Sequence, residues 1–156
     1  MSKLSKIILV TFAVLIWGNA AQAEDFAKQV QARQAVMKLY AFNLGMLGGM
    51  AKGDIAYDAA KASSAANNLN ALVNLDNSAL WPAGSDMSAA GMADKTRAKK
   101  EIWENFAQVG TIQKDLIAAA GKMASEAGNG VDAIRANIGA IGKNCGACHK
   151  PFRAEK

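Results

Sequence analysis

The sequence contains little that could support catalysis and little that favours β-structure. His149 is its only histidine, Pro82 and Pro151 are its only prolines, and it has two cysteines. Valine and isoleucine are sparse after residue 23 and never alternate in the pattern of a strand, whereas alanine is abundant. This composition favours helices throughout. Because the chain has no second histidine, no nucleophile–base pair and no metal-ligand cluster, we do not expect an enzyme.

Dense basic runs are missing as well. The formal net charge is +5, and Lys3 and Lys6 supply two of those charges. Proteins that bind nucleic acid usually carry a basic stripe or cluster. The charge pattern therefore predicts no nucleic-acid partner, and it says little about other partners.

The first 23 residues have the layout of a secretory signal peptide. A short positive start is followed by residues 7–17, which are uncharged and largely apolar, and then by the small-x-small cleavage site Ala21-Gln22-Ala23. An uncleaved membrane anchor is the alternative, but those eleven residues are too few to span a bilayer. We therefore predict cleavage after Ala23 and a single periplasmic domain, residues 24–156, without a membrane anchor.

Four helices are expected in that domain. Their predicted ranges are 25–52, 57–75, 94–127 with Asp94 as a cap, and 131 onward, separated by an irregular stretch at 76–93 and a stop at Gly128-Asn129-Gly130. Residues on the first helix recur at spacings of three and four, which forms one stripe: Phe26, Val30, Arg33, Met37, Tyr40, Leu44, Leu47 and Ala51. The third helix has a similar set in Ile102, Phe106, Val109, Leu116 and Met123. Such helices bury their stripes best as an all-α antiparallel bundle.

The chemistry is concentrated near the C-terminus, where both cysteines lie in Cys145-Gly146-Ala147-Cys148-His149. Two thiols three positions apart can each add to a vinyl group of one porphyrin, and the histidine that follows can bind the iron as an axial ligand. Export and the motif support each other, because this attachment is expected in exported proteins. We therefore predict one covalently attached c-type haem, with its iron, per chain.

Three other uses of these residues are less well supported. A thioredoxin-like redox pair would need a βαβ pattern, which the sequence lacks. A zinc site would need four ligands, and two cysteines and one histidine fall short. A structural disulfide would leave the adjacent His149 without a role.

Several further segments accompany the C-terminal motif: Arg33–Lys38 (RQAVMK), Gly48–Gly53 (GGMAKG), Tyr57–Ala60 (YDAA), Trp81–Ser85 (WPAGS), Glu101–Trp103 (EIW) and Phe152-Arg153. Together with the motif they resemble the cytochrome c′ family, the class II c-type cytochromes, over essentially all of residues 24–156. The resemblance implies an up-down-up-down four-helix bundle and a periplasmic haem protein, commonly a homodimer through the first two helices. It also implies that Met37 covers the distal face of the haem and that Arg153 lies near the proximal face. Pro151 departs from the pattern, and we expect the last helix to kink or end there.

A second protein ligand to iron would have to be a methionine. The candidates after residue 23 are Met37, Met46, Met50, Met87, Met92 and Met123. Met37 shares the stripe of the first helix, whereas Met46 and Met50 lie on roughly the opposite face and are interpreted as contact surface for a second helix or subunit.

The resemblance leaves two outcomes open for Met37, because both kinds of protein occur in the family. If its sulfur binds the iron, the protein is a low-spin one-electron carrier, which we favour. If it only covers the haem, the iron is five-coordinate and binds nitric oxide or carbon monoxide. As a third reading, Met37 only fills the core. A hypothesis of another class is a helical interaction module without haem.

Arg33 lies one turn before Met37 on the apolar stripe. A buried charge needs a partner, and a haem propionate could accept two hydrogen bonds from its guanidinium. The alternative is that Arg33 extends from the stripe to water. Trp81 and Trp103 are interpreted as packing residues and not as redox relays.

Overall fold

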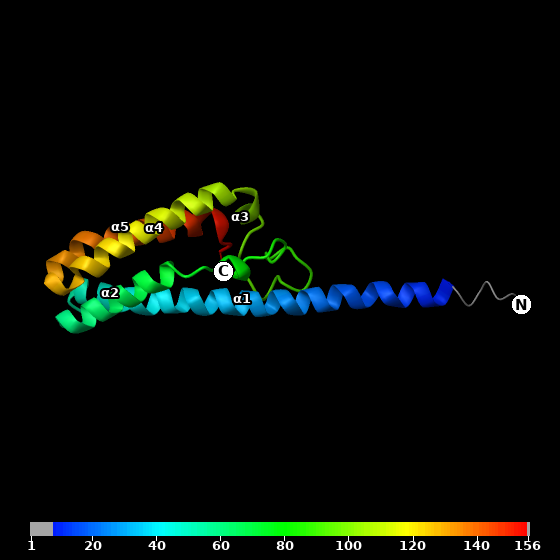
Figure 1. The fold of residues 1–156 in the computed structure, drawn as a ribbon, viewed down its shortest axis with the longest axis horizontal. Coiled ribbons are helices and arrows are strands. Elements are labelled where there is room, and N and C mark those ends of the chain that lie inside the picture. The colour runs from blue at the N-terminus through cyan, green and yellow to red at the C-terminus, as the bar shows by residue number, and fades with distance from the viewer. Residues whose placement is uncertain (1–7, 156) are drawn as a thin grey trace, which may run out of the picture.

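The chain folds into two antiparallel helical hairpins that pack against each other (Figure 1). The computed structural model describes residues 8–155, with side chains from Phe26 onward. The four long helices are α1 (Ile8–Lys52), α2 (Ala59–Val73), α4 (Phe106–Glu126) and α5 (Val131–Phe152). Three short pieces connect them: η2 (Ser78–Leu80), α3 (Glu101–Glu104) and η3 (Ala127–Asn129). The predicted up-down-up-down four-helix bundle is confirmed.

The predicted signal peptide, residues 1–23, lies outside the part of the chain whose side chains are described. Its cleavage therefore stays a prediction. Over residues 8–155, no helix combines the length and the apolar character needed to cross a membrane.

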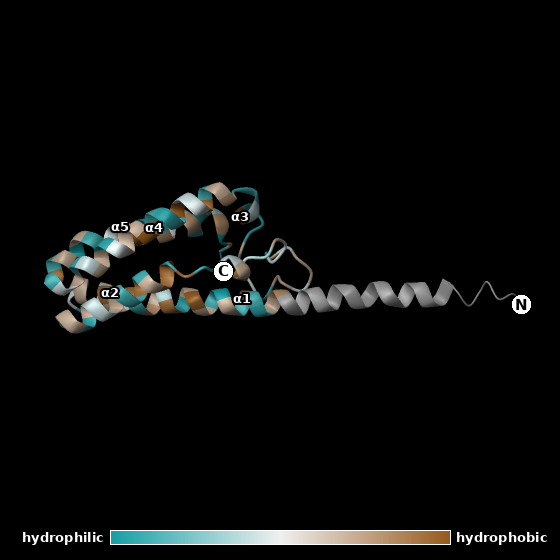
Figure 2. Ribbon diagram, in the orientation of Figure 1, coloured by the Kyte–Doolittle hydropathy of each residue, from teal (hydrophilic) through white to brown (hydrophobic). Residues whose placement is uncertain are grey.

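A large hydrophobic cluster, here called the main core, fills the space between the four long helices. Its buried members come from all four helices, and Figure 2 shows apolar and polar residues alternating along each of them. From α2 the core takes Ala62, Ala65 and Ala66, whose small side chains let neighbouring helices approach closely. Leu47 of α1, Met123 of α4 and Ile134 of α5 are fully buried in it.

The buried arc of α1 is wider than the predicted stripe. Val30, Arg33, Tyr40 and Leu47 of the stripe are buried as expected. Met50, however, is only 1% exposed and belongs to the main core, so of the two predicted contacts it makes the one with a neighbouring helix and not one with a second subunit. Met46 is partly buried against the same core. The reason is that α1 packs against both α2 and α5, and two neighbours bury a broader face than one.

The third helix begins later than predicted, and Asp94 does not cap it. Two residues before the helix are held by backbone hydrogen bonds to the C-terminal segment: Lys99 N–H donates to Phe152 O (3.0 Å), and Ala154 N–H donates to Arg97 O (2.9 Å). An isolated antiparallel bridge joins Ala98 to Arg153. Helix formation therefore starts only at Glu101.

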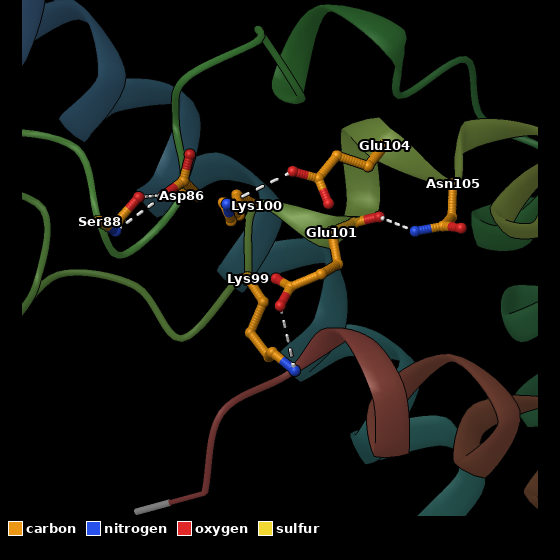
Figure 3. A network of polar contacts seen from close by, with 7 residues as sticks. All are labelled: Asp86, Ser88, Lys99, Lys100, Glu101, Glu104 and Asn105. Carbon is orange, nitrogen blue, oxygen red and sulfur yellow. Dashed lines mark hydrogen bonds and ion pairs between the residues drawn. The ribbon is translucent and has the colours of Figure 1, made fainter.

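Asn105 then separates α3 from α4, with φ −123° and ψ 36°. The interruption shifts the helical register, so that Phe106, predicted to be a core residue, is 59% exposed. Figure 3 shows the exposed ion pairs around α3, from Lys99 to Glu101 (3.7 Å) and from Lys100 to Glu104 (3.6 Å). Exposed pairs of this kind contribute little to stability, on the order of 0–1 kcal/mol.

The turn between α4 and α5 confirms the predicted stop. Gly130 has φ +123°, a conformation that side chains disfavour, and α5 starts at the next residue. The Tyr57 hydroxyl donates to Ala127 O (3.0 Å) and accepts from Gly130 N–H (2.9 Å). Tyr57 thus fastens this turn to the start of α2.

The opposite end of the bundle contains a smaller hydrophobic cluster, here called the second core. Ala98, Ile102 and Phe152 are its buried members, and the partly buried residues against them are Trp81, Trp103, Val109, Ile112 and Cys148. Trp81 and Trp103 pack with ring centroids 6.3 Å apart, as expected for packing residues. α5 ends at Phe152, one residue after Pro151, as the proline predicted.

Candidate functional site

Cys145, Cys148 and His149 lie together in the last two turns of α5. Residues three and four positions apart share one side of a helix, so both thiols and the imidazole project from one face. Both cysteines are free and half-buried. Cys145 packs against the main core, and Cys148 packs against the second core. The attachment sequence therefore spans the boundary between the two clusters.

The pKa shifts of these groups disfavour a reactive pair of thiolates and favour a histidine that binds a metal. Burial raises the pKa of the Cys145 thiol, and burial together with the neighbouring Cys145 raises that of Cys148. A thiolate redox pair would require the opposite shift. Burial, with Arg153 and Arg97 nearby, lowers the pKa of His149, which favours the neutral imidazole that binds metals.

α1 and α5 run antiparallel, and their register can be followed along the bundle. Each step back along α1 matches one step forward along α5, because both helices rise equally per residue. Two contacts establish this register. Arg135 Nε donates to Ala51 O (2.8 Å), and a Cβ on Gly48 would lie 3.7 Å from Ile138 Cδ1.

The same register puts Met37 and His149 at matching levels along the bundle. Met37 lies fourteen residues before Ala51, and His149 lies fourteen residues after Arg135. Met37 is 39% exposed, although Arg33 before it and Tyr40 after it on the same stripe are buried. Among the other candidate methionines, Met50, Met92 and Met123 are fully buried, and Met46 and Met87 are partly buried.

These residues fit a planar group held between α1 and α5. The two half-buried thiols and the imidazole project from one face of α5, and Met37 lies at the matching level of α1. The break in the buried stripe at Met37 is what such a group would require, because its face needs an apolar side chain that no protein group covers.

A pocket of about 340 Å³ opens beside His149. Its lining includes three cationic side chains, Arg97, Lys150 and Arg153, and one carboxylate, Glu155. The structure thus places Arg153 next to His149, despite Pro151 between them.

Arg33 is buried, 3% exposed, as the stripe predicted, but its partners are protein groups. Nη1 donates to Ser85 Oγ (2.7 Å) and Leu80 O (3.4 Å), and Nη2 donates to Ser85 O (2.5 Å) and Thr96 Oγ1 (3.0 Å). Burial lowers its pKa to about 10, partly offset by Asp86. A propionate is therefore not needed to explain why this arginine is buried, and a contact with one stays a prediction.

Sequence reasoning did not find the polar partners of Arg33. Ser85 and Thr96 lie in the irregular segment and carry no motif of their own. The tryptophan-proline turn was visible in the sequence, but its contact with Arg33 was not.

Fold and site together define an all-helical bundle with a c-type haem attachment sequence on its last helix. A family model described as Cytochrome C′ matches residues 28–153, and the chain belongs to this family of c-type haem proteins. It is 35% identical to a cytochrome c-554 of Cereibacter sphaeroides over 150 residues, covering 94% of each chain.

Solved structures agree with the sequence comparison. The chain superimposes on a cytochrome c′ from Rhodobacter sphaeroides with a TM-score of 0.76 at 31% identity, covering 84% of this chain and 98% of the other. A second cytochrome c′, described as having ligand-controlled dimer dissociation, matches with a TM-score of 0.75 at 30% identity and covers 83% and 97%.

Proposed function

We propose that this chain is a periplasmic one-electron carrier with one covalently bound haem. Cys145 and Cys148 would hold the haem as thioethers, and His149 would bind its iron. The haem supplies the redox chemistry, and the protein tunes it through axial ligation and burial. Arg153, beside His149, would help to keep the imidazole in its neutral form.

The observation that carries this proposal is the position of Met37. Its level along α1 matches that of His149 along α5, and its side chain is 39% exposed whereas Arg33 and Tyr40 of the same stripe are buried. If the Met37 thioether bound the iron together with the His149 imidazole, the site would be low-spin and would suit electron transfer, because no small ligand would need to leave or enter.

The first experiment compares optical spectra of the oxidised and reduced protein with those of Met37→Ala. A low-spin spectrum with a thioether-to-iron band that the substitution removes supports the proposal. A high-spin spectrum that Met37→Ala does not alter would refute Met37 as a ligand.

The second candidate function is binding of nitric oxide or carbon monoxide. It is favoured by a solved nitric oxide complex of a cytochrome c′ variant from Alcaligenes xylosoxidans, which matches this chain with a TM-score of 0.67 at 27% identity. In that case Met37 would cover the haem without bonding to iron, and the reduced protein would bind carbon monoxide tightly with or without Met37.

Covalent attachment is tested separately from ligation. Protein exported together with the attachment machinery should keep haem stain after denaturing electrophoresis, and His149→Ala should keep the stain while losing the native spectrum. Absence of stain would favour the haem-free interaction module. Mass spectrometry of the same material tests cleavage after Ala23.

We also propose that two copies pair through the outer face of α1 and α2. A groove of about 280 Å³ lies between these helices, lined by Phe42, Met46, Ala60 and Ala65 among others. Phe42 is 67% exposed on this face. Phe42→Lys should shift the protein towards monomer in sedimentation, whereas the matched control Phe106→Lys, on α4, should not. An unmodified protein that sediments as a monomer would remove the basis for this interface.

A further inference from the structure

The Arg33 side chain is the centre of a polar cluster at the attachment end of the bundle. Besides its hydrogen bonds to Ser85 and Thr96, its guanidinium carbon lies 4.5 Å from the centroid of the Trp81 ring. A buried cation with this many partners has one conformation, since each partner fixes its direction. Arg33 therefore ties α1 firmly to the segment between α2 and α3.

The contacts continue from Trp81 to the haem attachment site. Trp103 Nε1–H donates to Trp81 O (3.1 Å), and the two rings pack together. Both rings pack against the second core, which includes Phe152 and Cys148 of α5. A continuous path of packed side chains thus leads from α1, one turn before Met37, to a cysteine one residue before His149.

We infer that the second core is a spacer that holds Met37 at bonding distance from the iron bound to His149. Arg33, Trp81 and Trp103 are its positioning residues, and none of them would itself bind the iron. This inference rests on the proposed function, because it assumes that Met37 lies over the haem.

The physical reason is the shape of the bundle. The main core fixes the four helices toward the α4–α5 turn, whereas the second core joins α3 and the end of α5 at the other end of the bundle (Figure 1). A small change in the spacing of helices there changes the gap between a thioether and an iron atom directly. The affinity of a competing ligand then rises with the fraction of molecules in which the thioether is withdrawn.

The test uses the haem-loaded protein and three variants. Trp103→Phe keeps an aromatic ring but loses the hydrogen bond to Trp81 O. Arg33→Met removes the cation, and Arg33→Lys restores it without the guanidinium's multiple donors. Tyr57→Phe is the matched control, because it loses two hydrogen bonds at the α4–α5 turn, far from the site.

Two quantities are measured beside the melting temperature: the high-spin fraction of the oxidised protein and the carbon monoxide affinity of the reduced protein. We expect Trp103→Phe and Arg33→Met to raise carbon monoxide affinity by roughly fivefold or more, with Arg33→Lys in between. Tyr57→Phe should lower the melting temperature but leave both quantities unchanged.

Two results would overturn the inference. The first is that Trp103→Phe and Arg33→Met lower the melting temperature without changing carbon monoxide affinity. The second is that Tyr57→Phe changes the affinity as much as they do. Met37→Ala separates these failures from failure of the proposed function. If Met37→Ala alters the carbon monoxide affinity while Trp103→Phe and Arg33→Met do not, the inference about the spacer is wrong and the assignment of Met37 stands. If Met37→Ala alters nothing, both are wrong.

Discussion

The two hydrophobic clusters of this bundle are built on different principles. The main core consists of side chains from long helices, many of them small or aliphatic, and it needs few directed contacts. The second core gathers short pieces of the chain around two tryptophans. Of the six buried polar side chains among the described residues, four lie at this end: Arg33, Ser85, Asp86 and Thr96.

This difference matters for function. Close-packed aliphatic side chains resist changes of volume but tolerate many arrangements of similar volume. Hydrogen-bonded polar groups and stacked rings specify direction as well as volume. The end of the molecule that carries the thiols and the histidine is therefore the end where position is most closely defined.

The largest effect on stability is expected in the main core. Ile134→Ala removes a fully buried side chain between helices, and such truncations cost about 2–5 kcal/mol because a cavity remains. Urea titration followed by circular dichroism measures the loss. The optical spectrum of the folded fraction should match that of the unmodified protein, and a changed spectrum would contradict the separation between the two clusters.

The matched substitution in the second core is Ile102→Ala. Ile102 is buried beside Phe152 and Trp103 at the end of the bundle, so the cavity can relax and the loss should be smaller, about 2 kcal/mol. The spectrum should change even under conditions where the protein is fully folded. A purely thermodynamic effect with an unaltered spectrum would mean that the second core does not position the site.

Tyr57→Phe sharpens the comparison from the other end of the bundle. It removes the donor to Ala127 O and the acceptor for Gly130 N–H, which should cost about 1–2 kcal/mol in the free energy of unfolding. Thermal melting measures this. No loss of stability would show that water replaces the hydroxyl at this turn.

The smallest expected effect is on the stability of the protein at acidic pH. Asp86 is buried, which by itself raises its pKa, but the hydroxyl and N–H of Ser88 donate to it and lower the pKa overall. A carboxyl whose folded-state pKa lies below its unfolded value stabilises the protein above pH about 4, and this contribution is lost as the pH falls through the folded-state pKa. Asp86→Asn should therefore flatten the decline of stability below pH about 4, as acid titration of unfolding would show. An identical decline in both proteins would assign the acid sensitivity to other groups.

Much of the fold could be predicted because helical periodicity is local. Val30, Tyr40 and Leu47 were placed correctly from spacing alone, and the Gly128–Gly130 stop depends only on neighbouring residues. The start of α3 could not be predicted in this way, since residues 97–99 are held by backbone partners at 152–154. Phe106 failed for a related reason, the interruption at Asn105.

The candidate site likewise contains some residues that local sequence reveals and others that it does not. The attachment sequence is contiguous, so its thiols and imidazole could be identified without a structure. The burial of Arg33 also followed from its stripe. Its partners Ser85 and Thr96 lie 52 and 63 residues away in the chain, and no local pattern links them to it.

The second core also constrains when Cys148 can become enclosed during folding. Its members come from the segment around Trp81, from α3, from the first half of α4 and from the end of α5, so it cannot close until these segments have met. Contacts between distant parts of a chain form late because their loops must close first. Cys148 is therefore enclosed only when segments from both halves of the chain have come together, so the site of attachment closes through contacts between distant parts of the sequence.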